Sequence, residues 1–561
     1  MANPNSQLQA ALAQFAAQPG VTPAQEAQLR ATVASDARLL EHLNQNAAAG
    51  HLKGFAPSQV GAQSNLVGTY DKTSGVVTLP ASSFAPTGAV FSADLIATLR
   101  LQDMSLRFAH SDYDDPVNKL CRPITQEMVN NLQSTINGSP ALAQEIKKAV
   151  TPPGPGQAAP LQYFVPLSGT VAGGTYDGNT KTMSLPPTSL SSPFNSADMT
   201  FVLGHEVQHA FNHAAMTAAS QSFNTETWQI AQSNSLAHDY TAPIGKLTHA
   251  SREDEASAQI AGWNALLSQQ QKIKPTAGLD DMLKLQWQTQ RVLDFVEFNR
   301  TTKSAQPHPG VTFNPDATLS QTPANIAAAG QYYFDKPPKG TPGIPANQTT
   351  GIGFHGDSDY RNYYGAHAVG RAIDTERSYA QPINGHAPNM HVDMSRLGLR
   401  EDLMERNGIT IGKNPGTPQP YNDTSQLPPA PRHFDHTNTP AGVPNSHQHV
   451  PVVPGATGTF GTNAGDPRDP ESVQPSGKPQ AQQELSPTAD FSAYLDRMLA
   501  AAQSGDDASF RKMTQTLADL PPGRELRAEA VATIDQQEQL AAQHQAQLQQ
   551  AAQVSGPVMR M

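Results

Sequence analysis

The chain has 561 residues, of which 37% are hydrophobic, and it carries a formal net charge of -11 at pH 7. This length exceeds the size at which one hydrophobic core keeps growing, so we expect two to four folded units. The negative charge is spread without a basic stripe, which argues against nucleic acid and anionic membrane surfaces as main partners. The single cysteine, Cys121, excludes an intramolecular disulfide.

No apolar run in the sequence is long enough to span a bilayer, so no transmembrane segment is predicted. The first twenty residues, MANPNSQLQAALAQFAAQPG, lack the basic region and the long apolar region of a secretory signal peptide. We therefore do not expect export by the general secretory route.

Residues 1–60 are rich in Ala and Gln and predict an N-terminal helical segment without a chemical motif. Further along, the sequence GTYD at 68–71 recurs at 174–177, and each copy is followed by Leu-Pro, Ser and a Ser-Ala-Asp helix start. This pattern predicts a hairpin that leads into a helix in both copies. Either a duplicated unit or coincident turn and cap preferences would explain the repetition.

The most specific motif lies in the second copy, where the sequence FVLGHEVQHAF contains His205, Glu206 and His209. Positions i and i+4 of a helix share one face, so the two histidines can bind one metal ion while Glu206 stands beside it. Zn²⁺ suits two imidazoles, one further ligand and an open position for a water whose pKa falls toward neutrality. Glu206 can then act as the general base. The alternative is an amphipathic helix with two surface histidines around a solvated glutamate.

In the first copy, Leu101, Gln102 and Ser105 occupy the positions of the motif's three polar residues. The region 61–150 is therefore expected to be a hairpin-helix unit without a metal.

The third metal ligand is not the next histidine of the helix. His213 lies eight residues beyond His205, about 12 Å along a helix axis, which is too far for the same coordination sphere. A metzincin would have a glycine and a third histidine where this chain has Asn212 and Ala215. The chain therefore does not match that class.

A later acidic segment, SREDE at 251–255, supplies three candidate carboxylates. Apolar residues at helical spacing between positions 256 and 267 place Glu255 close to the buried stripe of the predicted helix. Glu253 and Asp254 remain alternative ligands. Without a metal, the acidic segment would simply favour the helix dipole.

An HExxH motif paired with a glutamate on a later helix resembles the gluzincin metallopeptidases, and SRxxExxA at 251–258 looks like the third-ligand helix of the HtpX-like and CaaX-prenyl-protease group. The resemblance implies that both histidines of the motif and Glu255 bind zinc, with Glu206 as general base. The group usually has an aspartate where this chain has Gln259, an amide that lacks the charge to raise ligand basicity. Those enzymes are membrane-embedded, so the resemblance covers catalytic parts and not the substrate.

The resemblance also implies that an extended peptide pairs with the strand before the HExxH helix, within residues 161–185. Peptide hydrolysis further needs a donor for the negative oxygen of the tetrahedral state. The sequence offers six candidates for this donor: His238, Tyr240, His249, Tyr363, Tyr364 and His367.

These observations predict an α+β, mainly helical protein whose zincin-like catalytic core, with small β-hairpins, spans 151–300. A long packed helix is expected over 270–300, and residues 301–412 are expected to form the C-terminal lobe of the catalytic body. The Pro- and Gly-rich stretch 413–488 predicts a flexible linker. Apolar stripes and a Gln-rich segment predict a helical module at 489–561.

An enzymatic body without a signal peptide, a long linker and a helical C-terminal module together resemble bacterial effectors of type IV or type VI secretion. The resemblance implies synthesis in a bacterial cytoplasm and delivery into a target cell. It also implies a peptide or peptidoglycan substrate, a contact with secretion machinery or an adaptor through residues 489–561, and a cognate inhibitor. The sequence thus predicts a zinc-dependent metallopeptidase. The rivals are a zinc-binding interaction protein with weak or no catalysis, and a secretion adaptor.

Overall fold

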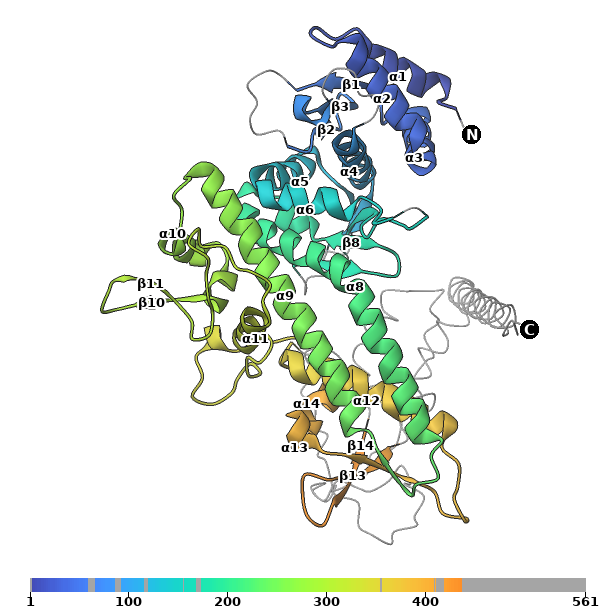
Figure 1. Ribbon diagram of the computed structural model, residues 1–561, viewed down its shortest axis with the longest axis vertical. Helices are drawn as coiled ribbons and strands as arrows, with labels where there is room; N and C mark the ends of the chain where they lie inside the picture. Colours follow the sequence, from blue (N-terminus) through green and yellow to red (C-terminus); the bar gives the residue numbers. More distant parts are fainter. Residues whose placement is uncertain are drawn as a thin grey trace, which may run out of the picture. The chain divides into compact units, whose positions relative to one another are not determined.

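The computed structural model describes residues 3–58, 66–85, 92–115, 120–154, 156–167, 173–353, 356–407, 409 and 418–435. These residues form an α+β, mainly helical body with several small sheets (Figure 1). The sequence-predicted linker from residue 436 onward and the predicted helical module at 489–561 lie outside the described residues.

The chain opens with three helices, α1 (Ser6–Ala16), α2 (Pro23–Ser35) and α3 (Ala37–Ala48). Asp36 is the single residue between α2 and α3, and its side chain accepts hydrogen bonds from the first backbone N–H groups of α3. This cap lets a second helix start immediately after the first one ends. The N-terminal segment is thus helical up to residue 48.

Two segments of the chain fold into the same small sheet followed by a helix. In the first, the strand order is β1-β3-β2. In the second, it is β6-β8-β7. In each sheet the outer strands flank a central strand that is parallel to the first and antiparallel to the second. The elements are β1 (Gly54–Pro57), β2 (Thr69–Asp71), β3 (Val76–Leu79) and α4 (Ala93–Ala109), then β6 (Tyr163–Pro166), β7 (Thr175–Asp177), β8 (Thr182–Leu185) and α8 (Ser196–Ala231).

A glycine contact at the same place in both copies supports their equivalence. A Cβ on Gly68 would lie 3.3 Å from Cδ of Gln102, and a Cβ on Gly174 would lie 3.4 Å from Cγ of Glu206. Gln102 donates from Nε2 to the carbonyl oxygen of Val67 at 2.7 Å, so the first copy uses this position to tie strand to helix. Coincident turn preferences do not account for a shared strand order and a shared contact. We therefore read the two segments as a duplicated unit.

Short elements connect the two copies and lead into α8. They are β4 (Asp112–Asp114), β5 (Cys121–Pro123), α5 (Gln126–Gly138), α6 (Pro140–Ala149), α7 (Pro187–Leu190) and the 3-10 helices Ala81–Ser83 and Pro193–Asn195. At the positions that match the motif's histidines, Leu101 and Ser105 are buried in α4.

The long helices α8 and α9 (Thr241–Ile273) lie side by side and run antiparallel (Figure 1). Their closest approach is at two glycines. A Cβ on Gly204 would lie 2.7 Å from Cβ of Ala265, and a Cβ on Gly262 would lie 2.5 Å from the Phe201 ring. Because only glycine has no Cβ, this pair lets the two backbones come close together. The crossing is one residue before His205 on α8.

Helix α8 contributes side chains to all three hydrophobic cores. Met199, Leu203 and Val207 pack in the first core, with the two small sheets. Phe201 packs in the second core, beside the apolar face of α9. Phe223, further along the helix, packs in the third core. The HExxH motif therefore lies beside the first and second cores, on a helix that the third core holds further along.

The prediction of one long helix over 270–300 was wrong. Helix α9 ends at Ile273, and Lys274 adopts an extended conformation before Pro275, as expected for a residue that precedes proline. The following segment contains α10 (Leu279–Lys284), 3-10 helices at Leu285–Trp287 and Gln290–Asp294, and the hairpin of β10 (Val296–Asn299) with β11 (Ser304–Pro307). Its apolar residues are nevertheless partly buried, which is why the sequence pattern resembled a packed helix.

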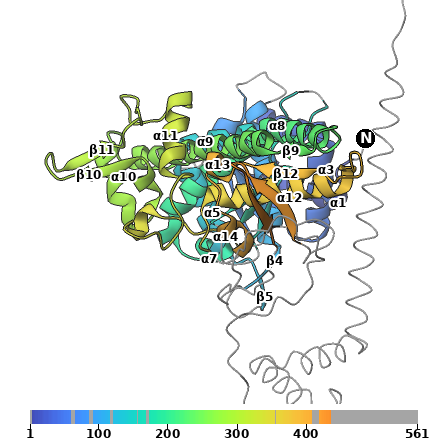
Figure 2. The same cartoon turned by 90° about the horizontal axis from the view of Figure 1, so that it is seen from below.

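Most of the remaining elements build the third core around a four-stranded sheet of order β14-β13-β12-β9, whereas α11 packs in the second core. In Figure 2 this sheet and α12 lie together beside the α8–α9 pair. The elements are β9 (Ala237–Asp239), α11 (Pro323–Tyr332), the 3-10 helix Ala346–Gln348, α12 (Tyr360–Tyr379), β12 (Asn389–Val392), α13 (Met394–Leu397), α14 (Glu401–Arg406), β13 (Gln419–Asp423) and β14 (Ala430–Phe434).

The prediction that the flexible linker begins at residue 413 was wrong for residues 418–435. Strands β13 and β14 form an antiparallel hairpin, and β13 pairs in parallel with β12. Two buried aromatic side chains hold this hairpin, since the rings of Tyr421 and Phe434 stack at 4.0 Å. The many Pro, Asn and Thr residues around them hide the strand pattern in the sequence. Among the helices of the described segments, none has the length and apolar character required to cross a membrane.

Candidate metal centre

The structure brings the three predicted metal ligands together from two helices. His205 and His209, on α8, face each other with their Nε2 atoms 3.0 Å apart. Glu255, on α9, places its Oε2 atom 3.4 Å from Nε2 of His205. One ligand atom from each residue lies within 4.8 Å of the others. Only 6% of the surface of His205 and of Glu255 is exposed, so the cluster is well shielded from solvent.

The donor set and its spacing fit a tetrahedral zinc ion. Two ligand atoms bound to zinc at its usual distances and at the tetrahedral angle lie roughly 3.3 Å apart. Two of the three separations, 3.0 Å between the histidines and 3.4 Å between His205 and Glu255, bracket this value, and all three lie within 4.8 Å. Within the described residues, Oε2 of Glu255 is buried and accepts no hydrogen bond. A buried carboxylate oxygen in this state needs a cation or a donor, and a metal ion would supply the cation.

Two further side chains orient the ligands from outside. Asp254 lies with Oδ2 3.1 Å from Nδ1 of His209, and its other oxygen accepts a hydrogen bond of 2.8 Å from Asn212. Tyr364, on α12, donates its hydroxyl to Oε1 of Glu255 at 2.5 Å. A carboxylate on the far nitrogen of a ligand histidine fixes its tautomer and raises its basicity. Asp254 therefore supports a ligand in the structure and is not itself a member of the ligand cluster.

The other alternative ligand, Glu253, points away from the cluster. Its side chain is 58% exposed and lies 3.4 Å from Nε2 of His249. Gln259, the departure from the family pattern, is fully buried on α9. In the described part of the chain neither its amide nor Nδ1 of His205 has a hydrogen-bond partner. The charged outer support thus belongs to His209 through Asp254, and not to a carboxylate at position 259.

The electrostatics of the cluster favour a positive charge at its centre. Burial alone would lower the pKa of His209, but the hydrogen bond that its ring donates to Asp254 and the charge of Glu255 raise it to about 10. Burial alone would raise the pKa of Glu255, but the nearby imidazole of His205 and the charge of His209 lower it to about 2. Opposite charges within a few ångströms account for both directions. A proton can supply this positive charge, and a divalent metal ion would supply a larger one.

A cleft of about 950 Å³ opens over the cluster and includes Glu206. One wall is the segment 173–178, which contains β7, the outer strand of the sheet β6-β8-β7. Of residues 161–185, which were predicted to line the cleft in part, the C-terminal half does so. His213 also lines the cleft, but it is not a member of the metal-ligand cluster.

The six candidates for an oxyanion donor have different surroundings. Tyr363 and Tyr364 line the cleft. His238 and Tyr240 instead lie in the third core, where both contact Glu376, at 2.7 and 2.6 Å. His249 is exposed beside Glu253, and His367 does not line the cleft.

Sequence reasoning missed two tyrosines that face the candidate metal site. The hydroxyls of Tyr333 and Tyr360 hydrogen-bond to each other, and both residues line the cleft. The Tyr333 ring lies edge-on to that of His205, with centroids 6.2 Å apart. Burial is the main cause that raises the pKa of each hydroxyl, so both stay protonated at neutral pH. No sequence signal marks them, because they come from irregular chain around 333 and from the start of α12.

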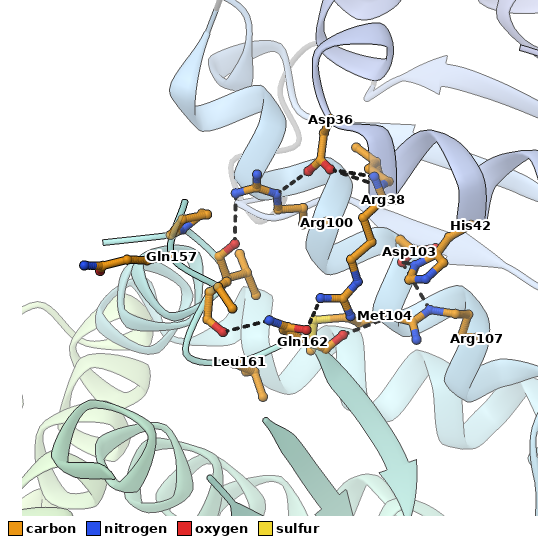
Figure 3. Close-up of a pocket in the computed structure, with 15 residues that line it drawn as sticks. Asp36, Arg38, His42, Arg100, Asp103, Met104, Arg107, Gln157, Leu161 and Gln162 are labelled. Atoms are coloured by element: carbon orange, nitrogen blue, oxygen red, sulfur yellow. Dashed lines mark hydrogen bonds and ion pairs between the residues drawn. The ribbon is translucent and has the colours of Figure 1, made fainter. Parts of the chain in front are cut away.

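A second cavity, of about 320 Å³, lies between the first copy and the segment that leads into β6 (Figure 3). Its charged groups mostly neutralise one another. Arg100 donates to Asp36 at 2.7 Å, and Asp103 accepts from Arg107 at 3.1 Å. His42 also contacts Asp103, at 2.9 Å. We read this group as an ion-pair network that ties α3 to α4, while Arg107 links it to the second copy by donating to the carbonyl oxygen of Gln162 at 2.9 Å.

No protein-family model matches this chain, and neither the curated proteins nor the solved structures give a match.

Proposed function

We propose that this protein is a zinc-dependent metallopeptidase with a zincin-like core. In this proposal His205, His209 and Glu255 hold Zn²⁺, and Glu206 is the general base. The observation that carries the proposal is the convergence of two imidazoles and one carboxylate from α8 and α9 at the floor of a cleft that also contains Glu206. A lone HExxH helix could carry its histidines on the surface, whereas a buried triad with outer support is the arrangement that zinc requires.

In the proposed hydrolysis, the residues of the cleft have separate roles. When bound, zinc polarises the scissile carbonyl and lowers the pKa of water toward neutrality. Glu206 is 7% exposed and lines the cleft beside the ligands, so it can accept a proton from the attacking water and pass it to the leaving amine. The hydroxyls of Tyr333 and Tyr360 stay protonated and can donate to the negative oxygen of the tetrahedral state.

The outer strand β7 supports an extended peptide as the substrate. Its edge away from β8 has no strand partner in the described part of the chain, and its residues line the cleft. A peptide can add to such an edge through main-chain hydrogen bonds. Gly173 and Gly174 sit at the start of this edge, where a side chain would collide with Val202.

The experiment is a comparison of zinc content and peptide hydrolysis in the wild type and in Glu206→Gln. We expect the variant to retain zinc and to lose turnover by at least a hundredfold, because the ligands are intact and only the base is removed. Glu253→Gln is the matched control, since this exposed glutamate lies outside the cluster and should change neither quantity. Unchanged turnover in Glu206→Gln would contradict the proposal.

The proposal extends to the biological setting only through the resemblance to secreted effectors. On that reading the substrate is a protein or a peptidoglycan cross-link in a target cell. The C-terminal residues 489–561 then contact secretion machinery or an adaptor, and a cognate inhibitor protects the producer. Deleting residues 489–561 should abolish delivery and leave hydrolysis in place. Loss of both activities would contradict a separate delivery role.

The second candidate function is a zinc-binding interaction protein without turnover. The observation that favours it is Gln259, whose buried amide offers no charge to the ligand histidines and makes no hydrogen bond among the described residues. Zinc bound stoichiometrically with no hydrolysis of any peptide in a mixed library would favour this rival.

A further inference from the structure

One basic side chain faces the otherwise acidic cleft. Arg291 lies in the 3-10 helix Gln290–Asp294, and it is the only arginine or lysine among the described residues that line the cleft. Its Nε atom donates to Oδ1 of Asp198 at 3.2 Å. Neither terminal nitrogen of the guanidinium has a hydrogen-bond acceptor within the described chain. The side chain thus presents two unused donors at the cleft wall.

The guanidinium lies close to the place where a peptide would bind. A Cβ on Gly173 would lie 2.9 Å from Nη2 of Arg291, and a Cβ on the next residue, Gly174, would lie 3.4 Å from Cγ of Glu206. Consecutive Cα atoms are about 3.8 Å apart. Arg291 is therefore roughly one residue along the strand edge from the general base. A group that it binds would lie within about one or two residues of the cleaved bond.

The charge of Arg291 is maintained in this position. Burial works against the charged form, but Asp198, followed by more distant groups, raises the pKa of the guanidinium above its usual value. The other charged groups of the cleft, Glu206, Asp254 and Glu255, would repel an anion. Two parallel N–H donors on one guanidinium match the geometry of a carboxylate.

A purely structural role explains only part of this arrangement. Asp198 has a second donor, since the hydroxyl of Thr289 reaches its Oδ1 at 2.7 Å, so the segment is tied to α8 without the guanidinium. The guanidinium also lies over the Phe201 ring, 5.7 Å from its centroid, but this contact uses the face of the group and leaves its terminal nitrogens without an acceptor among the described residues. Their position indicates a ligand that arrives from the cleft.

We propose that Arg291 selects substrates by binding a carboxylate of the peptide within one or two residues of the cleaved bond. The carboxylate is either the C-terminal group or the side chain of an Asp or Glu. This inference rests on the proposed peptidase function. Arg291 is then a specificity residue, and Glu206 remains the catalytic base.

The test begins with a mixed decapeptide library and the zinc-loaded full-length protein, with cleavage sites identified by mass spectrometry. Matched peptides then separate the two sources of the carboxylate: a C-terminal acid against its amide, and an internal Asp or Glu against Asn or Gln. We expect kcat/KM to favour one acidic member by roughly tenfold to a hundredfold, the range of a hydrogen bond to a charged group. Arg291→Met should reduce this ratio to near one, and Arg291→Lys should keep part of it.

Two variants sharpen the result. Among the described residues, Asp198 supplies the one carboxylate that contacts the guanidinium, so Asp198→Asn should raise the acidic preference. Arg30→Met removes an exposed arginine from an ion pair on α2 and should leave the preference as it is in the wild type. Dissociation constants of the same peptides on zinc-loaded Glu206→Gln provide a readout without turnover, and Arg291→Met in that background should lose the discrimination.

The outcomes separate the two proposals. Hydrolysis without any preference for an acidic peptide would overturn the role of Arg291 and leave the peptidase intact. A uniform fall in kcat for acidic and neutral peptides in Arg291→Met would also overturn it, because that pattern belongs to transition-state stabilisation. Absence of hydrolysis in the zinc-loaded wild type would instead defeat the peptidase function itself.

Discussion

Three adjacent acidic residues, Glu253, Asp254 and Glu255, should respond very differently to loss of their charge. The structure gives them separate roles, in solvent, beside a ligand histidine and in the ligand cluster. We consider Asp254→Asn first, because it tests the outer support of the site. The asparagine can still accept a hydrogen bond from Nδ1 of His209 but no longer carries a charge.

The magnitude follows from the contacts of Asp254. Its carboxylate lies 3.1 Å from the ring of His209, and both side chains are about 15% exposed, so solvent screens the pair only in part. Loss of an outer partner typically weakens metal binding by roughly ten- to a hundredfold. Because a neutral hydrogen bond is retained, we expect Asp254→Asn to weaken zinc binding by an amount near the lower limit, about 1.4 kcal/mol of binding free energy. Asp254→Ala, which also leaves Asn212 without its acceptor, should lie nearer the upper limit.

The assay is a zinc dissociation constant from competition with a chromogenic chelator at fixed pH. Glu255→Gln should weaken binding by more than a hundredfold, because it removes a ligand, and Glu253→Gln should match the wild type. The order wild type, Asp254→Asn, Glu255→Gln is the expected result. An unchanged constant in Asp254→Asn, or an equal loss in Glu253→Gln, would refute the assignment of the three carboxylates.

Four further predictions concern other residues and the pH dependence. Gly262→Ala places a methyl group against Phe201 and should destabilise the fold by roughly 1–3 kcal/mol, measured as a lower midpoint in chemical denaturation. Zinc binding at pH 7.5 should release about one proton, measured by calorimetry in buffers of different ionisation enthalpy, because His209 has its pKa raised to about 10 and must lose its proton to bind metal. Because of the same pKa shift, the metal-free protein should lose stability as the pH rises from about 6.5, the pKa of a histidine in the unfolded chain, to about 10, the pKa of His209 in the folded protein. A gain in stability over that range would contradict this prediction. Tyr333→Phe should lower kcat by about ten- to a hundredfold with little change in KM, whereas an equal loss in KM would assign it to substrate binding.

The clustering of His205, His209 and Glu255 could be predicted from the sequence because helix geometry constrains it strongly. Spacing by four residues places His205 and His209 on one face, and helical periodicity places Glu255 next to a buried stripe. Periodicity alone could not separate Glu255 from Asp254, because adjacent residues differ by only about 100° around a helix. The choice depends on how α9 is rotated against α8, and the close contact at Gly204 and Gly262 fixes that rotation.

Other parts of the site and fold could not be predicted from local patterns. Tyr333 and Arg291 reach the cleft from irregular segments, where no period links a residue to a face. The hairpin at 418–435 depends on two buried rings, Tyr421 and Phe434, within a composition that is typical of linkers. In both cases long-range packing, and not local propensity, decides the structure.

The duplicated unit provides its own metal-free reference. The first copy builds the same sheet and helix with Leu101, Gln102 and Ser105 where the second has the motif, and it is held by apolar packing and by the hydrogen bond from Gln102 to Val67. The zinc that we propose for the second copy is then not needed for folding, unlike the ion of a zinc finger, which must bind before the domain can fold. Chelation should therefore yield an inert but intact protein that regains its ion when zinc returns, so metal supply alone could turn the chemistry on and off.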